Sequence, residues 1–141
     1  MANLEKAIRL AAKAHEGQID KAGQTYILHP IRVMLAVQSE EERIAAVLHD
    51  TVEDTSITFS DLRDAGFSDE IVDAVRALTR LDGESRVDAA RRAAANPIAR
   101  RVKLADVADN MDLSRISKPI ERDRARRAEY ERVREILLRG P

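Results

Sequence analysis

Residues 45–55 read AAVLHDTVEDT and place an apolar run directly before a cluster of ionisable side chains. The apolar residues follow helical spacing, so they predict a buried helix that presents His49 and Asp50 at its end. Glu53 and Asp54 follow within four residues. Burying carboxylates so close together costs free energy through mutual repulsion and lost hydration. A divalent cation would remove that cost, and the stretch therefore predicts a metal site.

The rest of the chain also follows helical periodicity, and no segment alternates with the two-residue period of a strand. Alanine, leucine, arginine and glutamate are abundant, and they are good helix formers. We therefore expect an all-α fold. The expected helices run from about Asn3 to Glu16, from His29, from Ser39 to Asp50, from Thr58 to Ala65, from Ser68 past Leu78, from Glu84 to Ala95, from Asn96 to Asp112, and from Pro119 to Leu138. The last of them carries many opposite charges and is interpreted as a solvated face.

Composition narrows the class of protein further. The 141 residues suit one compact domain with its own core. There is no cysteine, which excludes disulfides, thiolate metal ligands and cysteine nucleophiles, and which suits a reducing cytoplasm. The 24 basic and 25 acidic residues balance, and only 3% of residues are aromatic, so nucleic-acid polymers are not expected partners. No signal-peptide core and no membrane-spanning run is present, so we expect a cytoplasmic protein without a membrane partner.

Two further stretches offer side chains for a metal site. His29 stands before Pro30, and Asp106 follows an apolar stretch that would turn its carboxylate inward. Asn110 lies four residues later, on the same face of a helix as Asp106. Imidazole and carboxylate ligands without thiolate suit manganese, iron or zinc. Each motif alone usually has a trivial explanation, and only their combination is specific for a metal site. His15, late in the first helix, is interpreted as structural.

Taken in order, these motifs resemble those of the HD-domain superfamily. Within it, the chain is most similar to the hydrolase domain of the Rel/Spo bifunctional alarmone enzymes and to the small stand-alone alarmone hydrolases. The likeness covers nearly the whole chain. The matching stretches are AHEGQ at 14–18, KAG at 21–23, YILHP at 26–30, AAVLHDTVEDT at 45–55, and VKLAD at 102–106 with Asn110.

The resemblance implies a single-domain HD bundle, a bound metal that is usually manganese, and a small phosphorylated nucleotide as partner. The family reaction removes pyrophosphate from the 3′ position of guanosine tetra- or pentaphosphate. The resemblance implies metal ligation by His29, His49, Asp50 and Asp106, water activation by Glu53 and Asp54, and substrate contacts from Lys21, Gly23 and Asn110. Lys21 and Lys103 are candidates for neutralising the leaving phosphate, although Lys103 could equally be a solvated helix charge.

The chain also departs from the family pattern around the pocket. Asp20 stands where a basic residue is common, Ala22 stands where serine is common, and a tyrosine often found near Arg86 is missing. After Asp106 the run is Val-Ala-Asp-Asn, where the bifunctional enzymes have Arg-Leu-His-Asn. These changes leave two alternatives open. One is hydrolysis of another nucleotide, such as a nucleoside monophosphate or a phosphorylated dinucleotide; the other is a non-catalytic nucleotide-binding or regulatory module.

Overall fold

The computed structural model describes residues 2–112 and 121–140, and its regular structure is helical throughout that part. One isolated antiparallel bridge, between Ile19 and Thr25, closes the loop after the first helix. The all-α expectation is confirmed. The expected start of the last helix at Pro119 lies outside the described residues. The helices are α1 (Leu4–Ala14), α2 (Leu28–Leu35), α3 (Glu40–Leu48), α4 (Thr51–Asp54), α5 (Phe59–Asp64), α6 (Asp69–Leu78), α7 (Arg86–Ala94), α8 (Pro97–Met111) and α9 (Glu121–Arg139).

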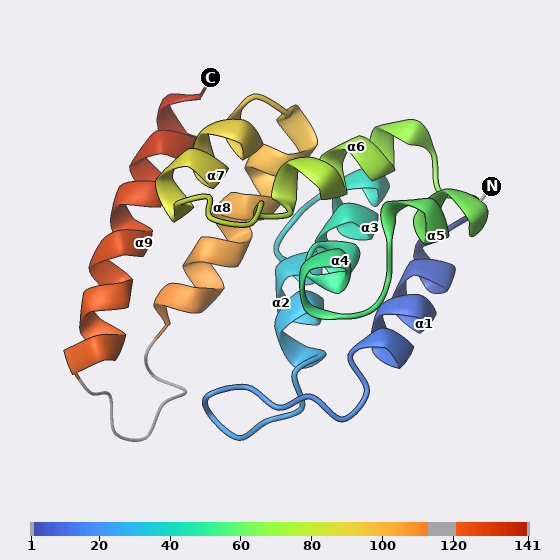
Figure 1. The fold of residues 1–141 in the computed structure, drawn as a ribbon, viewed down its shortest axis with the longest axis horizontal. Helices are drawn as coiled ribbons and strands as arrows, with labels where there is room; N and C mark the ends of the chain where they lie inside the picture. Colours follow the sequence, from blue (N-terminus) through green and yellow to red (C-terminus); the bar gives the residue numbers. More distant parts are fainter. Residues whose placement is uncertain (1, 113–120, 141) are drawn as a thin grey trace.

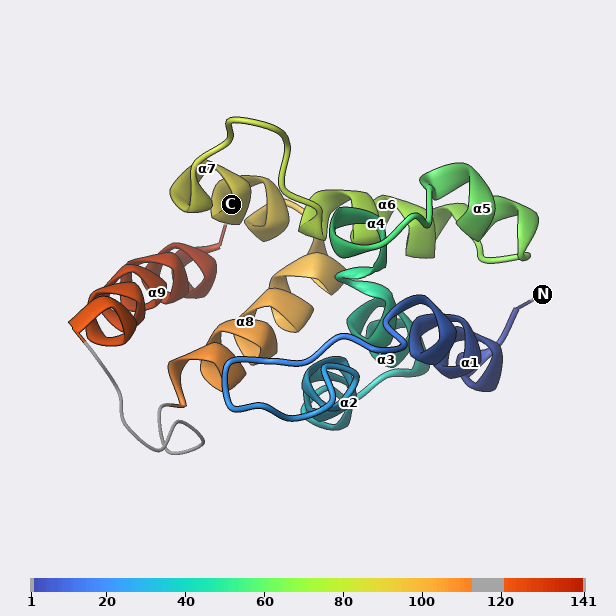
Figure 2. The ribbon, with the colours of Figure 1, turned by 60° about the horizontal axis from the view of Figure 1, so that its bottom comes forward.

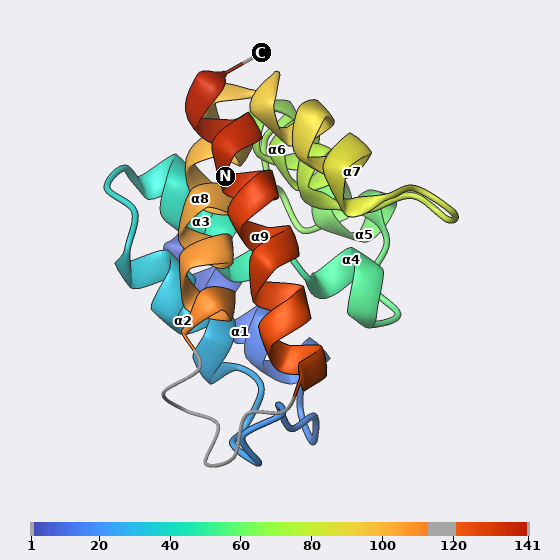
Figure 3. The ribbon, with the colours of Figure 1, turned by 90° about the vertical axis from the view of Figure 1, so that its left-hand side faces the viewer.

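Helix α8 is the central element of the bundle, because it contacts α2, α3, α6, α7 and α9. Figure 1 shows α1 and α5 at one end of the molecule and α7 with α9 at the other. In Figure 2, α8 runs between α9 and the pair formed by α2 and α3. Figure 3 shows α9 lying alongside α8, with which it packs. Among the described residues, no helix combines the length and the apolar character needed to cross a membrane.

The helix starts follow the side-chain caps that the sequence contains. The Ser39 hydroxyl accepts the Glu42 N–H at 3.1 Å, and the Glu42 carboxylate accepts the Ser39 N–H at 3.2 Å, which is the expected capping box. Thr58 and Asp61 repeat this arrangement at the start of α5. Asn96 caps α8, with Pro97 in its first turn. These caps set where α3 and α8 begin, and the two helices pack against each other.

The expected third helix is interrupted just where the ionisable cluster begins. Helix α3 ends at Leu48, and the short α4 starts at Thr51. The Thr51 hydroxyl donates to the Leu48 carbonyl at 2.7 Å, which satisfies one of the open carbonyls at the end of α3. His49 and Asp50 therefore occupy the bend between the two helices, and Glu53 and Asp54 belong to α4.

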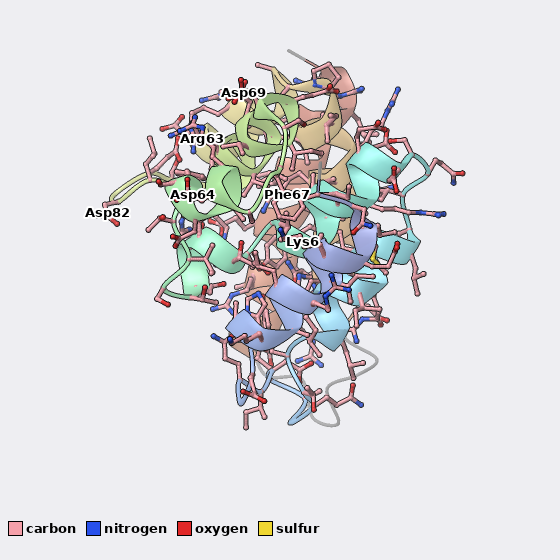
Figure 4. The ribbon with its side chains drawn as sticks, turned by 90° about the vertical axis from the view of Figure 1, so that its right-hand side faces the viewer. Lys6, Arg63, Asp64, Phe67, Asp69 and Asp82 are labelled. Carbon is pink, nitrogen blue, oxygen red and sulfur yellow. The ribbon has the colours of Figure 1, made fainter. Side chains whose placement is uncertain are left out.

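Helix α1 and the α5–α6 segment cover the side of the molecule remote from α9. Figure 4 labels Lys6 on α1 and Phe67 between α5 and α6, and it shows Asp82 at the tip of the loop between α6 and α7. The Lys6 ammonium donates to the Ala65 carbonyl at 2.6 Å, which ties α1 to the end of α5. Phe67 is buried among the aliphatic residues of the core.

Glu42 links the start of α3 to α8, and this link gives a pH-dependent contribution to stability. Its side chain is buried and accepts hydrogen bonds from the Gln38 and Ser39 N–H groups and from Arg101 at 2.8 Å. Burial raises the pKa of Glu42, but the bonds from Arg101 and the two N–H groups outweigh it and lower the pKa below 4.5.

Because the folded pKa lies below the unfolded value, the stabilisation is present above pH 4.5 and is lost as the pH falls through the lowered folded pKa. We expect Glu42→Gln to reduce the free energy of unfolding by about 1 kcal/mol at neutral pH. Urea unfolding of both proteins in chelator-treated buffer, across acidic to neutral pH, measures the difference. A difference that stayed constant to the acid end of the series would contradict this role of Glu42.

Candidate metal centre

Three helical segments bring His29, His49 and Asp106 into one buried cluster. Their ligand atoms all lie within 4.8 Å of one another. The Nε2 atom of His29 lies 2.9 Å from Oδ1 of Asp106, and Nε2 of His49 lies 3.4 Å from the same oxygen. The three residues come from α2, from the end of α3 and from α8, so the fold joins stretches of chain that lie far apart in the sequence.

Asp50 faces the same two imidazoles. Its Oδ2 lies 3.2 Å from Nε2 of His49 and 3.7 Å from Nε2 of His29. The Tyr26 hydroxyl donates to this oxygen at 2.5 Å and so fixes the carboxylate. Tyr26 lies near the end of the loop before α2; it begins one of the matching stretches, but it was not predicted to contact a ligand. All four expected ligands therefore converge, although among the described residues the group within 4.8 Å consists of His29, His49 and Asp106 without Asp50.

The state of His49 tests whether these residues fit a metal. Its Nδ1 donates to the Ala46 carbonyl at 2.6 Å, so the lone pair of this tautomer lies on Nε2. That Nε2 is buried and has no hydrogen-bond partner within the described part of the chain. Buried polar atoms without a partner are rare and costly. Two imidazoles and two carboxylates are ligands that divalent transition metals accept, so the residues fit such an ion.

Charged neighbours dominate the electrostatics of the cluster. Burial lowers the pKa of His29, but hydrogen bonds with Asp106 and Asp109 outweigh it and raise that pKa to about 10. Burial raises the pKa of Asp106, but the Lys103 ammonium and the two imidazoles hold it well below its usual range. Burial also raises the pKa of Asp109, whereas its bonds with His29 and Arg32 hold it well below its ordinary value. The cluster therefore combines anionic carboxylates with imidazoles and a cation at neutral pH.

Lys103 and Asn110 both contact Asp106. The Lys103 ammonium lies 2.8 Å from Oδ2 of Asp106, and the Asn110 amide donates to Oδ1 at 3.1 Å. Lys103 lines the cavity beside the cluster, so the alternative of a solvated helix charge is wrong. Asn110 lines the same cavity, where the resemblance implies a substrate contact.

Glu53 and Asp54 lie on α4 at the rim of the cavity. One oxygen of Glu53 accepts the Arg80 N–H at 2.8 Å, which anchors the carboxylate to the end of α6. Burial and the charges of Asp50 and Glu53 raise the pKa of Asp54. The two carboxylates thus face the cavity from the segment that follows His49 and Asp50.

The loop between α1 and α2 forms another wall of the cavity. Lys21 lines it and pairs with Asp123 of α9 at 3.1 Å. Asp20 also lines it, and its Oδ1 accepts the N–H groups of Ala22 and Gln24, both at 2.9 Å, so this carboxylate shapes the loop. Gly23 takes a φ of +79°, which other residues rarely adopt, but it is not among the residues that line the cavity.

The cavity extends from the cluster to α7 and α9 and has a volume of about 440 Å³, a size suited to a small-molecule ligand. Its far wall combines apolar residues of α6, α7 and α9 with Arg80, Arg86, Arg126 and Tyr130. Arg86 pairs with Glu129 at 2.5 Å and lies 5.5 Å from the centre of the Tyr130 ring. The interpretation of the last helix as a solvated face is therefore wrong for the side that carries Arg126 and Tyr130.

Comparisons with known proteins agree with this geometry. Residues 7–111 match the HD domain family. A guanosine-3′,5′-bis(diphosphate) 3′-pyrophosphohydrolase of Vibrio cholerae is 36% identical over 83 residues, which cover 56% of this chain and 12% of that protein. A GTP pyrophosphokinase of Streptomyces coelicolor is 33% identical over 141 residues, covering 91% of this chain and 16% of that protein.

The chain thus spans only 12% to 16% of the length of these two relatives. The solved structure of a metazoan ortholog of SpoT, described as hydrolyzing ppGpp, superimposes with a TM-score of 0.80 and 26% identity. That likeness covers 99% of this chain and 87% of the other. The family match spans more than half of the chain and includes every residue of the buried cluster. The chain therefore belongs to the HD domain family.

Proposed function

We propose that this chain is a divalent-metal-dependent phosphohydrolase, a single HD domain that removes pyrophosphate from the 3′ position of guanosine tetra- or pentaphosphate. The observation that carries the proposal is the buried His29–His49–Asp106 cluster beside a cavity of about 440 Å³. Within the described residues, Nε2 of His49 in this cluster makes no hydrogen bond. The names of the relatives, which include pyrophosphohydrolases acting on this nucleotide, support the choice of substrate.

On this proposal His29, His49, Asp50 and Asp106 hold the metal, and manganese is the ion we expect. When bound, such an ion supplies a Lewis acid for phosphoryl oxygens and lowers the pKa of a bound water. Tyr26 and Lys103 keep the Asp50 and Asp106 carboxylates in place through their hydrogen bonds. The chain thus contributes three buried ligands and the partly buried Asp50, with both carboxylates held by hydrogen bonds.

Glu53 is the proposed proton acceptor for the attacking water, with Asp54 beside it. The Arg80 N–H holds one Glu53 oxygen. The other oxygen makes no hydrogen bond within the described residues and can receive a proton. Positioned acid–base groups of this kind contribute about 10²- to 10⁴-fold to a rate.

The cations of the cavity are the proposed phosphate contacts. Lys103 lies beside the cluster, whereas Arg80, Arg86 and Arg126 lie along the far wall. Cations at both ends favour a nucleotide that carries phosphate on two positions of its ribose. Lys21 and Asn110, which also line the cavity, would contact the nucleotide, and Gly23 would act through the shape of its loop.

Asp20 favours one alternative, a different phosphorylated nucleotide as substrate. Its carboxylate lines the cavity where a cation is common in the family, and it adds negative charge close to Lys21. A substrate with fewer phosphates would meet less repulsion there. The reaction and the residues that carry it would stay the same.

Incubation with guanosine tetraphosphate and Mn²⁺, with pyrophosphate release as the readout, tests the proposal. Release of pyrophosphate together with guanosine diphosphate is the expected result. A panel of nucleoside monophosphates and phosphorylated dinucleotides runs beside it. If the protein hydrolysed a nucleotide of the panel but not guanosine tetraphosphate, the proposed substrate would be wrong and the alternative substrate class would be supported. No turnover of any nucleotide by metal-loaded protein would overturn the enzymatic proposal and favour a binding module.

A further inference from the structure

Asp109 contacts the side of the His29 ring that points away from the metal cluster. Its Oδ2 lies 2.6 Å from Nδ1 of His29, while Oδ1 of Asp106 lies 2.9 Å from Nε2 on the other side. Asp106 and Asp109 are one helical turn apart on α8, so both carboxylates project from the same face. The ring of His29 is therefore held between two carboxylates of one helix.

Arg32 in turn holds Asp109. Its Nε donates to Oδ1 at 2.8 Å, and its Nη2 donates to Oδ2 at 3.1 Å, a two-pronged contact that fixes the plane of the carboxylate. Arg32 follows His29 by one turn on α2. Helix α2 thus supplies His29 and Arg32, and helix α8 supplies Asp106 and Asp109. His29 contacts both carboxylates, and Arg32 contacts Asp109. The side chains of His29, Asp109 and Arg32 are only 7%, 12% and 30% exposed.

The two imidazoles of the cluster differ in what holds their Nδ1 atoms. Nδ1 of His49 donates to a neutral acceptor, the Ala46 carbonyl, whereas Nδ1 of His29 faces the anionic Asp109. When a metal is bound at Nε2, a carboxylate on the remote nitrogen would keep the proton there, fix the ring and make it a better ligand. Nothing in the local sequence pattern pairs Asp109 with His29.

We propose that Asp109, anchored by Arg32, is the positioning residue that orients His29 toward the metal and thereby sets the metal affinity of the centre. This inference rests on the proposed function, because it takes His29 to be a metal ligand. Arg32 acts one step further out, by keeping the Asp109 carboxylate in the plane that His29 requires.

Titration with Mn²⁺ alone, followed by calorimetry, tests the proposal without any nucleotide. Asp109→Ala is expected to raise the dissociation constant of Mn²⁺ by about 10- to 100-fold. Asp109→Asn keeps the shape and one acceptor oxygen but loses the charge, so about a tenfold increase is expected. Arg32→Met keeps the carboxylate but not its anchor, and it should raise the dissociation constant less than Asp109→Ala does.

Glu84→Gln is the matched control. Arg92 binds Glu84 through the same two-pronged contact, at 2.7 Å from both Nε and Nη2, and these side chains are 11% and 33% exposed. If losing such an ion pair only destabilises the fold, then Asp109→Asn and Glu84→Gln should both lower the melting temperature. The Asp109 and Arg32 variants should weaken the binding of Mn²⁺, whereas Glu84→Gln should keep the wild-type affinity.

An Asp109→Asn protein that folds and binds Mn²⁺ with the wild-type dissociation constant would overturn the positioning role, and this variant decides the question if Asp109→Ala does not fold. Failure of the wild type to bind Mn²⁺ is a different outcome. It would overturn the metal centre of the proposed function and, with it, this inference. If the wild type bound Mn²⁺ but released no pyrophosphate, the positioning role of Asp109 would still hold, because it is tested by the affinity for Mn²⁺ and not by turnover.

Discussion

Asp106→Asn is expected to abolish Mn²⁺ binding and pyrophosphate release together. Oδ1 of Asp106 lies within 3.4 Å of both imidazole Nε2 atoms, and its Oδ2 pairs with Lys103, so this carboxylate is the common partner of the cluster. An asparagine keeps the shape, loses the charge and leaves the half-buried Lys103 ammonium without its counter-ion. Since a bound ion contributes several kcal/mol to phosphoryl transfer, kcat should fall by about three decades or more.

Metal-induced stabilisation provides a second measurement of the same change. A ligand that binds only the folded state stabilises it by about 2.7 kcal/mol at one hundred times its dissociation constant. Wild-type protein should therefore melt at a higher temperature in Mn²⁺ than in chelator, and Asp106→Asn should not. Because losing the Lys103 pair could prevent folding, His49→Ala serves as a second variant that removes a ligand atom and no ion pair with Lys103.

Asp69→Asn controls for the chemical change itself. Asp69 is 91% exposed at the start of α6, lies 3.9 Å from Arg63 and is labelled in Figure 4. This variant should keep the metal affinity, the metal-induced rise in melting temperature and the turnover of the wild type. Tight Mn²⁺ binding by folded Asp106→Asn and His49→Ala proteins would refute the assignment of the cluster as the metal centre.

The sequence predicted those features that depend on local pattern. Caps such as Ser39 and Asn96 fix where helices begin, because each cap satisfies N–H groups within its own first turn. The grouping of His29, His49, Asp50 and Asp106 was implied by the resemblance to the HD-domain superfamily, whereas the local pattern alone placed His49, Asp50 and Asp106 next to apolar runs. The burial of the adjacent helix faces then brings these ends together.

The partners of these residues could not be predicted in the same way. Asp109 meets His29, and Tyr26 meets Asp50, only because α2 packs on α8 and the loop before α2 folds back over the cluster. Such contacts depend on the rotation of one helix against another, which no single segment encodes. The same holds for Tyr130. The sequence of α9 predicts that its side is exposed to solvent, but α7 packs against α9 and Tyr130 lines the cavity.

Glu53→Gln is expected to separate catalysis from metal binding. Glutamine is isosteric and still offers an oxygen to the Arg80 N–H, so α4 and the end of α6 should keep their positions. It cannot accept a proton from water at neutral pH. If Glu53 is the general base, kcat should fall by about 10²- to 10⁴-fold, while the dissociation constant of Mn²⁺ stays at the wild-type value.

This pattern is diagnostic because the competing explanations alter different quantities. A misplaced ligand set would weaken Mn²⁺ binding, and a damaged nucleotide site would raise KM, whereas loss of a proton acceptor lowers kcat alone. Glu70→Gln, the same change at an exposed residue of α6, should leave all three quantities unchanged. Near wild-type kcat in Glu53→Gln would move the proton-accepting role to another group, and Asp54→Asn would then show whether its neighbour on α4 carries it.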